Sequence, residues 1–219
     1  MNETERYSET LEQHFPITVL ERRLHDVETL NEKLFAWIRD MAARYGAGAE
    51  NAAKSASIST QGGYQTSRRT NVFELDRPEI RSLRDRHVLP AVHRYLQTVF
   101  GEQARSFNPT LVGWSNLLAG GAWQSPHMHP TENNLASGVY YVHLPPLEPP
   151  EGCIEFLNPH PISVHHGFNT TRRIVPEEGM LLLFPPFYLH YVHPFRGDGE
   201  RAIIAFDVLA RRDVVHLVL

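Results

Sequence analysis

The sequence predicts a mainly β fold with supporting helices, in which a sandwich or barrel of the jelly-roll kind follows a helical first half. After Asn108 the chain becomes a series of short apolar segments, most of them ended by Gly or Pro, as in all-β sandwiches and barrels. Before that point, apolar residues recur at three- and four-residue steps, the period of an amphipathic helix. We expect a single domain over residues 1–219, with a helical part over 1–107 packed on a jelly-roll core over 108–210.

The first half is expected to contain one edge strand and two helices. Residues 15–20 form a β-branched run, placed at a sheet edge because Pro16 cannot donate to a ladder. Helices are predicted over residues 21–45 and 78–101. Between them, Gly62-Gly63 would either let the backbone approach another segment closely or form a turn, and we interpret the pair as a turn.

The second half is expected to contain six strands. They cover residues 110–118, 137–142, 152–157, 180–184, 189–192 and 201–209. Gly120-Gly121 is a turn signal that should end the first of them, and residues 144–150 and 158–173 are expected to be loops.

Charge and composition exclude several function classes. The formal net charge is −4 and no basic cluster is present, so we expect no nucleic-acid partner. Cys153 is the single cysteine, which excludes an intrachain disulfide framework and fits a cytoplasmic location. No window approaches the roughly 18 to 20 apolar residues of a membrane span. The sequence leaves the oligomeric state open, a homodimer included.

A histidine pair is the first sign of a metal site. His127 and His129 stand at i and i+2 between Pro126 and Pro130. In extended backbone, alternate side chains point the same way, so both imidazoles can face one point in space. The prolines fix local φ and keep the segment out of a helix.

Two later residues extend this site. His190 follows a buried-looking strand and a rigid stretch rich in Pro and aromatic residues, which is a well-supported position for a metal ligand. Arg201 begins a strand whose other members are almost all apolar. A guanidinium there needs an anion, supplied either by a protein carboxylate or by a ligand. Trp114 and Trp123 are interpreted as packing residues.

Six segments together resemble a known enzyme superfamily. They are His127-Met-His129, Ser137–Val142, Gly152–Phe156, Pro176–Pro185, His190–Pro194 and Arg201–Phe206. In this order and spacing they resemble the Fe(II)/2-oxoglutarate-dependent oxygenases, and among these the bacterial and phage group related to prolyl hydroxylases. The resemblance covers about residues 108–210. It implies a double-stranded β-helix, which is a cupin-like jelly roll, backed by the N-terminal helices.

The resemblance also implies cofactors and site residues. Members of this superfamily hydroxylate a substrate with Fe(II) and 2-oxoglutarate, releasing succinate and CO₂. Carried over, Arg201 matches the residue that pairs with the distal carboxylate of 2-oxoglutarate, and Tyr141 matches a strand residue that hydrogen-bonds the same group. Asn116 and Gln124 lie on strands that line the pocket in this superfamily.

The metal ligands match the superfamily at two positions of three. His127 matches the first histidine and His190 the distal one, but His129 stands where most members have Asp or Glu. We take His129 as the third ligand, since imidazole suits iron. The alternatives are that Glu132 supplies a carboxylate, or that water takes the position with His129 behind it.

Two other functions are compatible with the same residues. One is a cupin that uses a metal without 2-oxoglutarate, because Gly121, His127, His129 and Glu132 come near the first cupin motif; the Glu spacing is short, however, and the second motif is absent. The other is a non-catalytic sugar- or peptide-binding jelly roll with structural histidines. The substrate is not identified, and a free amino acid, a peptide side chain and a small metabolite all remain open.

Overall fold

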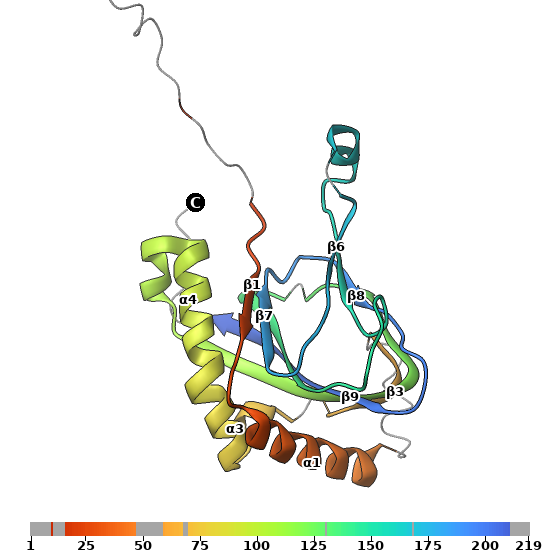
Figure 1. Cartoon of the computed structure of the whole chain (residues 1–219). Coiled ribbons are helices and arrows are strands. Elements are labelled where there is room, and N and C mark those ends of the chain that lie inside the picture. Colours follow the sequence, from red (N-terminus) through yellow and green to blue (C-terminus); the bar gives the residue numbers. More distant parts are fainter. Residues whose placement is uncertain are drawn as a thin grey trace, which may run out of the picture.

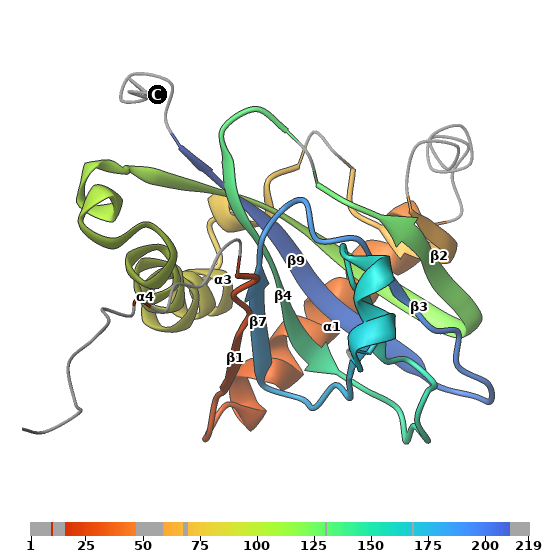
Figure 2. The same ribbon diagram turned by 90° about the horizontal axis from the view of Figure 1, so that it is seen from above.

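A curled antiparallel sheet organises the computed structural model, which describes residues 10, 16–46, 59–67, 70–129, 131–167 and 169–210 (Figure 1). The strands are β1 Leu20–Arg23, β2 Thr60–Gln65, β3 Pro109–His127, β4 Asn134–His143, β5 Ile154–Leu157, β6 Thr171–Ile174, β7 Met180–Phe184, β8 His190–Val192 and β9 Glu200–Ala210. Within the described residues their order is β1-β7-β4-β9-β3-β8-β5-β6, and β2 also pairs with β3. Figure 2 shows β9 running between β4 and β3. The expected mainly β fold is confirmed.

Successive side chains of a strand point to opposite faces of the sheet, and both faces are buried. On β9, Ala202, Ile204 and Phe206 join the core shared with the helices. Ile203 and Ala205 belong to a second core on the other face of the strand, inside the curl. A strand that is buried on both faces needs apolar side chains at nearly every position, which explains the continuous apolar runs of the sequence.

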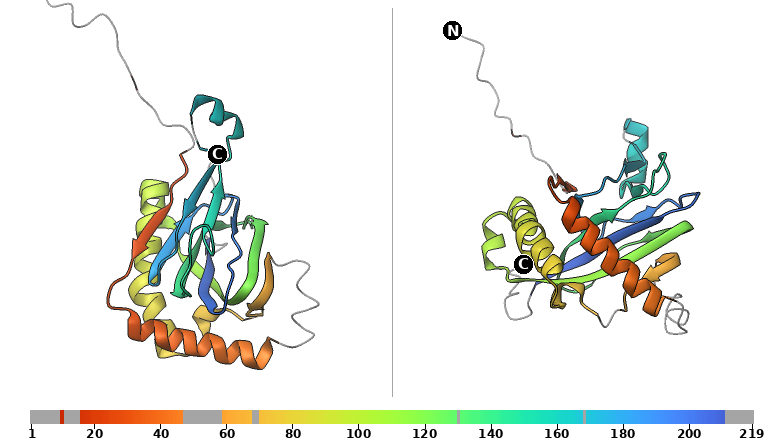
Figure 3. Two further views of the ribbon diagram at one scale, coloured as in Figure 1. Left: turned by 45° about the vertical axis from the view of Figure 1, so that its right-hand side comes forward. Right: turned by 60° about the horizontal axis from the view of Figure 1, so that its bottom comes forward.

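The helices cover the outer face of the curl (Figures 1 and 3). They are α1 Glu28–Tyr45, α3 Pro78–Leu83 and α4 Leu89–Phe100, with the π-helical turn η3 Arg84–Val88 between the last two. Short 3₁₀ turns are η2 Val72–Glu74, η4 Gly101–Ser106 and η5 Pro161–His166. α1 contacts β3 and β4, and α4 contacts β7, so the helices support the sheet as expected. None of the described helices is long and apolar enough to cross a membrane.

The predicted boundaries of the first strand and helix are wrong. Residues 20–23 pair with β7, so the edge strand begins at Leu20 and the helix begins only at Glu28. Tertiary pairing therefore overrides the helical period at residues 21–23. The predicted 78–101 helix is present, with a π turn directly before Pro90. Pro90 cannot sit inside a regular α-helix because its ring clashes with the carbonyl four residues earlier.

Both glycine pairs that were predicted to be turns lie inside strands, so these two predictions are wrong. Gly62-Gly63 belongs to β2, and a Cβ on Gly63 would lie 2.7 Å from Cδ2 of Leu118 on β3. Gly120-Gly121 lies within the 19-residue β3, where Gly121 has φ +84°. Glycine here permits a close approach of backbones and a bend in a continuing strand.

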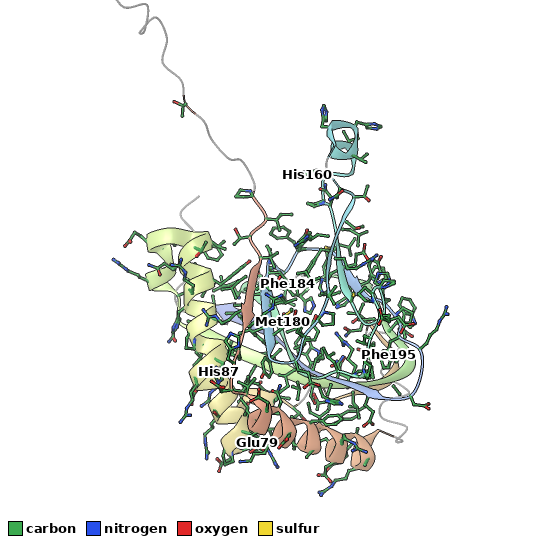
Figure 4. The ribbon with its side chains drawn as sticks, viewed as in Figure 1. Glu79, His87, His160, Met180, Phe184 and Phe195 are labelled. Atoms are coloured by element: carbon green, nitrogen blue, oxygen red, sulfur yellow. The ribbon has the colours of Figure 1, made fainter. Side chains whose placement is uncertain are left out.

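A hairpin projects from the sheet (Figures 1 and 3). It joins β5 to β6, and its tip carries η5. The loop expected over residues 158–173 therefore contains a short helical turn and the start of β6. Figure 4 labels His160 at the base of this projection, and His160, His165 and His166 are exposed.

Candidate metal and cosubstrate site

Three histidines converge at one end of the curl. His127 on β3 stands directly opposite His190 on β8 in the antiparallel register, so both side chains leave the sheet on the same face. Their ring centroids are 4.3 Å apart. His129 is two residues beyond His127, and one ring nitrogen of each histidine lies within 4.8 Å of the others. Within the described residues, no other group of three or more His, Cys, Asp or Glu side chains converges in this way.

The hydrogen bonds of these rings leave the same nitrogen free on each. His127 Nδ1 lies 2.7 Å from the Ser125 carbonyl, and His190 Nδ1 lies 2.8 Å from the Tyr188 carbonyl. A carbonyl can only accept, so Nδ1 carries the proton and Nε2 keeps a lone pair. His129 Nδ1 lies 3.1 Å from the Asp207 carboxylate, which leaves Nε2 free there as well.

Burial keeps two of the rings uncharged at neutral pH. It lowers the pKa of His127 to about 4 and, together with the neighbouring His127, lowers the pKa of His190 to about 3. His190 is only 3% exposed, with the Phe184 ring 4.8 Å away between centroids. Neutral imidazole is the form that binds a metal.

A cavity of about 460 Å³ opens beside the histidines. Its walls come from β2, β3, β4, β5, β7, β8 and β9, and Figure 4 shows the side chains that fill the curl, with Phe184 and Met180 labelled on β7. The lining includes Gln65, Val112, Trp114, Gln124, His127, His129, Val139, Tyr141, Ile154, Phe184, His190, Arg201, Ile203, Ala205 and Asp207.

Arg201 lines this cavity and is 1% exposed. Its Nε and Nη1 have no hydrogen-bond partner among the described residues, and neither has the hydroxyl of Tyr141. The guanidinium carbon lies 5.3 Å from the centroid of the Tyr141 ring. Burial lowers the pKa of Arg201 and raises that of Tyr141 to about 12, so Tyr141 keeps its proton. A buried guanidinium without a carboxylate partner is suited to an anionic ligand.

An amide network connects β2 to the cavity. Asn116 and Gln124 each donate a hydrogen bond to Oγ1 of Thr60, over 2.9 and 3.2 Å. The Thr60 hydroxyl in turn donates to Gln65 Oε1 over 3.1 Å. Gln124 lines the cavity, as expected, whereas Asn116 is fully buried on the same strand and is not among the lining residues.

Three positions differ from what the sequence suggested about the site. Trp114 lines the cavity and stacks against His129 with ring centroids 5.7 Å apart, so it is more than a packing residue. Glu132 is exposed and does not join the histidine group. Asp207 contacts His129 and was not expected; its place on an otherwise apolar strand, six residues after Arg201, is the signal that could have found it.

Comparisons with known proteins agree with this geometry. Residues 113–207 match the model of the family described as "Putative 2OG-Fe(II) oxygenase". No curated protein sequence matches the chain. Similar solved structures include a prolyl-4-hydroxylase from Pseudomonas putida, with 14% identity, a TM-score of 0.62 and coverage of 88% of this chain and 92% of that one.

Two further structures share the fold. A prolyl hydroxylase from Trichoplax adhaerens, solved with a peptide fragment of the hypoxia inducible factor oxygen degradation domain, has 14% identity, a TM-score of 0.60 and coverage of 89% and 83%. A viral collagen prolyl hydroxylase from Paramecium Bursaria Chlorella virus-1, in a 2OG complex, has 12% identity, a TM-score of 0.52 and coverage of 88% and 96%. The sheet is thus the double-stranded β-helix expected from the resemblance. Over residues 113–207 the chain is similar to the 2OG-Fe(II) oxygenases, an enzyme class whose cofactors are Fe(II) and 2-oxoglutarate, and its β core has their fold.

Proposed function

We propose that the protein hydroxylates a small-molecule, amino-acid or peptide substrate with Fe(II) bound by His127, His129 and His190. The observation that carries the proposal is the convergence of three imidazoles, each with Nδ1 already hydrogen-bonded and Nε2 free. Nitrogen donors of this kind suit Fe(II), and three ligands leave coordination positions for a cosubstrate and dioxygen. The donor set therefore fits the metal that the family uses.

The cosubstrate site follows from the buried charge. In this proposal Arg201 pairs with the distal carboxylate of 2-oxoglutarate and the Tyr141 hydroxyl donates a hydrogen bond to it. The support is the burial of both groups and the lack of a hydrogen-bond partner, among the described residues, for Nε and Nη1 of Arg201 and for the Tyr141 hydroxyl. Gln124, oriented by Thr60, would supply an amide group to the polar wall of the same cavity, and Asn116 would hold the same Thr60 hydroxyl from behind that wall.

When bound, Fe(II) and 2-oxoglutarate supply the oxidising power that hydroxylates a C–H bond, with dioxygen consumed and succinate and CO₂ released. The protein orients the reactants and keeps water out. Phe184, Val139 and Ile203 form apolar walls beside the histidines and the guanidinium. Charge pairing is strongest where such walls exclude water.

The remaining parts of the proposal concern organisation and substrate. We assign residues 108–210 as the catalytic core and residues 1–107 as its support. The single cysteine is consistent with a cytoplasmic protein. The Trichoplax enzyme was solved with a peptide, which makes peptides one substrate class to test alongside small molecules. No observation favours the cupin or the non-catalytic alternative.

The test is metal and 2-oxoglutarate binding by the purified protein, followed by Fe(II)-dependent formation of succinate. His190→Ala should abolish stoichiometric iron. Arg201→Ala should weaken 2-oxoglutarate binding by at least about 30-fold, since losing one partner of a buried charge pair costs roughly 2–5 kcal/mol. His193→Ala and Arg173→Ala are matched controls, because both side chains bind Glu155 and neither lines the cavity. Unchanged binding in both site variants would refute the proposal.

A further inference from the structure

The proposed ligand set lacks the carboxylate that most related sites have. With His129 in that place, three imidazoles surround the metal position. A carboxylate is nevertheless close by, in contact with the His129 ring and outside the group of three histidines. Asp207 Oδ1 lies 3.1 Å from His129 Nδ1, on the side of the ring away from Nε2.

Asp207 is held in place by further hydrogen bonds. The Ser137 hydroxyl donates to Asp207 Oδ1 over 2.7 Å, and Asn134 Nδ2 donates to the Ser137 oxygen over 3.2 Å. Asn134 Nδ2 also lies 3.1 Å from the backbone carbonyl of His129. These contacts form a closed circuit from the backbone of His129 through Asn134, Ser137 and Asp207 back to the His129 ring. The side chains of His129 and Asp207 are only 13% and 16% exposed.

The sheet fixes the position of this circuit. Ser137 on β4 stands opposite Asp207 on β9 in the antiparallel register. Asp207 follows Arg201 by six residues, so both side chains leave β9 on the same face, and both line the cavity. β9 therefore carries the charged groups for both halves of the proposed site.

We propose that Asp207 is a positioning residue for the metal centre, a role that rests on the proposed function. It accepts the Nδ1 proton of His129, which fixes the tautomer and aims Nε2 at the other two histidines. It also places a negative charge behind the His129 ring, where an aspartate at position 129 would have placed that charge on the metal ligand itself. A carboxylate behind a ligating histidine raises the basicity of that ligand.

The first test measures Co(II) affinity from the visible absorption of the bound ion, which also reports ligand number and geometry. Asp207→Asn should weaken binding by about 10- to 100-fold and change the spectrum, because the amide brings no charge and can favour the wrong tautomer. Glu155→Gln is the matched control. Glu155 is also a buried carboxylate bonded to a histidine, His193, but it lies outside the cavity, so Co(II) affinity should not change.

A double-mutant cycle separates positioning from a merely structural role. In a His129→Asp background, Asp207 would face a like charge, so adding Asp207→Asn should strengthen Co(II) binding or leave it unchanged. An equal loss in both backgrounds, or no loss in the native background, would overturn the inference. Should Asp207→Asn fail to fold, Ser137→Ala tests the same circuit with an expected loss of about three- to tenfold.

His127→Ala identifies which proposal has failed. If this variant loses Co(II) while Asp207→Asn keeps full affinity, the metal site stands and the role of Asp207 is wrong. If His127→Ala keeps full Co(II) affinity, the proposed metal site itself is wrong, and the role of Asp207 fails with it.

Discussion

Arg201 should cost the protein stability until 2-oxoglutarate binds. The guanidinium is 1% exposed, and its Nε and Nη1 are unpartnered among the described residues. Each buried donor without a partner costs about 1–3 kcal/mol, and replacing a buried charge by an apolar side chain of similar length is often stabilising by about 1–4 kcal/mol. Arg201→Met should therefore raise the stability of the cosubstrate-free protein by roughly 1–3 kcal/mol.

In a thermal melt this gain corresponds to an increase in Tm of roughly 2–12 °C for a chain of this size. Adding 2-oxoglutarate with Fe(II) under anaerobic conditions should narrow or reverse the difference in Tm between the two proteins. The native protein gains about 2.7 kcal/mol when the ligand is at 100 times its Kd, whereas a variant that binds about 30-fold more weakly gains only about 0.9 kcal/mol. The measurement is a pair of melts, with and without 2-oxoglutarate, for each protein.

Arg173 provides the matched control. Its Nε and Nη2 lie 3.0 and 2.9 Å from Glu155 Oε2, so Arg173→Met removes a guanidinium that already has its carboxylate. That variant should melt below the native protein and respond fully to 2-oxoglutarate. The reasoning about Arg201 is refuted if Arg201→Met melts below the native protein without cosubstrate and gains as much stability as the native protein when 2-oxoglutarate is added.

Two further predictions concern the sheet around the site. Burial alone would raise the pKa of Glu155, but hydrogen bonds from Thr171, His193 and Arg173 lower it to about 2. A pKa shift of this size contributes roughly 3 kcal/mol to the free energy of unfolding. This contribution is present above the unfolded-state pKa near 4.5 and is lost as the pH falls through about 2. Denaturant melts between these pH values should show the loss of stability, and Glu155→Gln should make the stability depend less on pH. Gly63→Ala should lower the free energy of unfolding by about 1–3 kcal/mol, because its Cβ would lie 2.9 Å from the backbone oxygen of Leu117; an unchanged urea midpoint would contradict this close approach.

The proposed ligands could be selected from the sequence because their pattern is local. The i, i+2 spacing of His127 and His129 requires only extended backbone to aim both rings one way, and Arg201 was recognisable as a charge at the start of an apolar strand. The structure brings these residues together with His190 around one cavity. The fold class was likewise accessible from the short apolar segments and from the two helical periods.

What the sequence did not reveal depends on partners distant in the chain. Gly63 and Gly121 have the composition of turn residues, and only the neighbouring strand shows that each is needed inside β2 or β3. The contact of Asp207 with His129 follows from the register of β9 and β4, which no local pattern specifies. The start of the first helix was missed for the same reason, since Glu21 is drawn into a strand by β7.

The pairing of β3 with β9 has a consequence for how the protein acquires its metal. β3 is the first strand of the core and β9 the last, yet they are hydrogen-bonded from Pro109↔Ala210 to Ala119↔Glu200. Contacts this distant in the chain form slowly, because loop closure must precede them. His127 at the end of β3 and His129 just after it are therefore synthesised well before the strand that carries Asp207 and Arg201. We expect iron to enter a folded core after synthesis, and not to serve as the nucleus around which the chain folds.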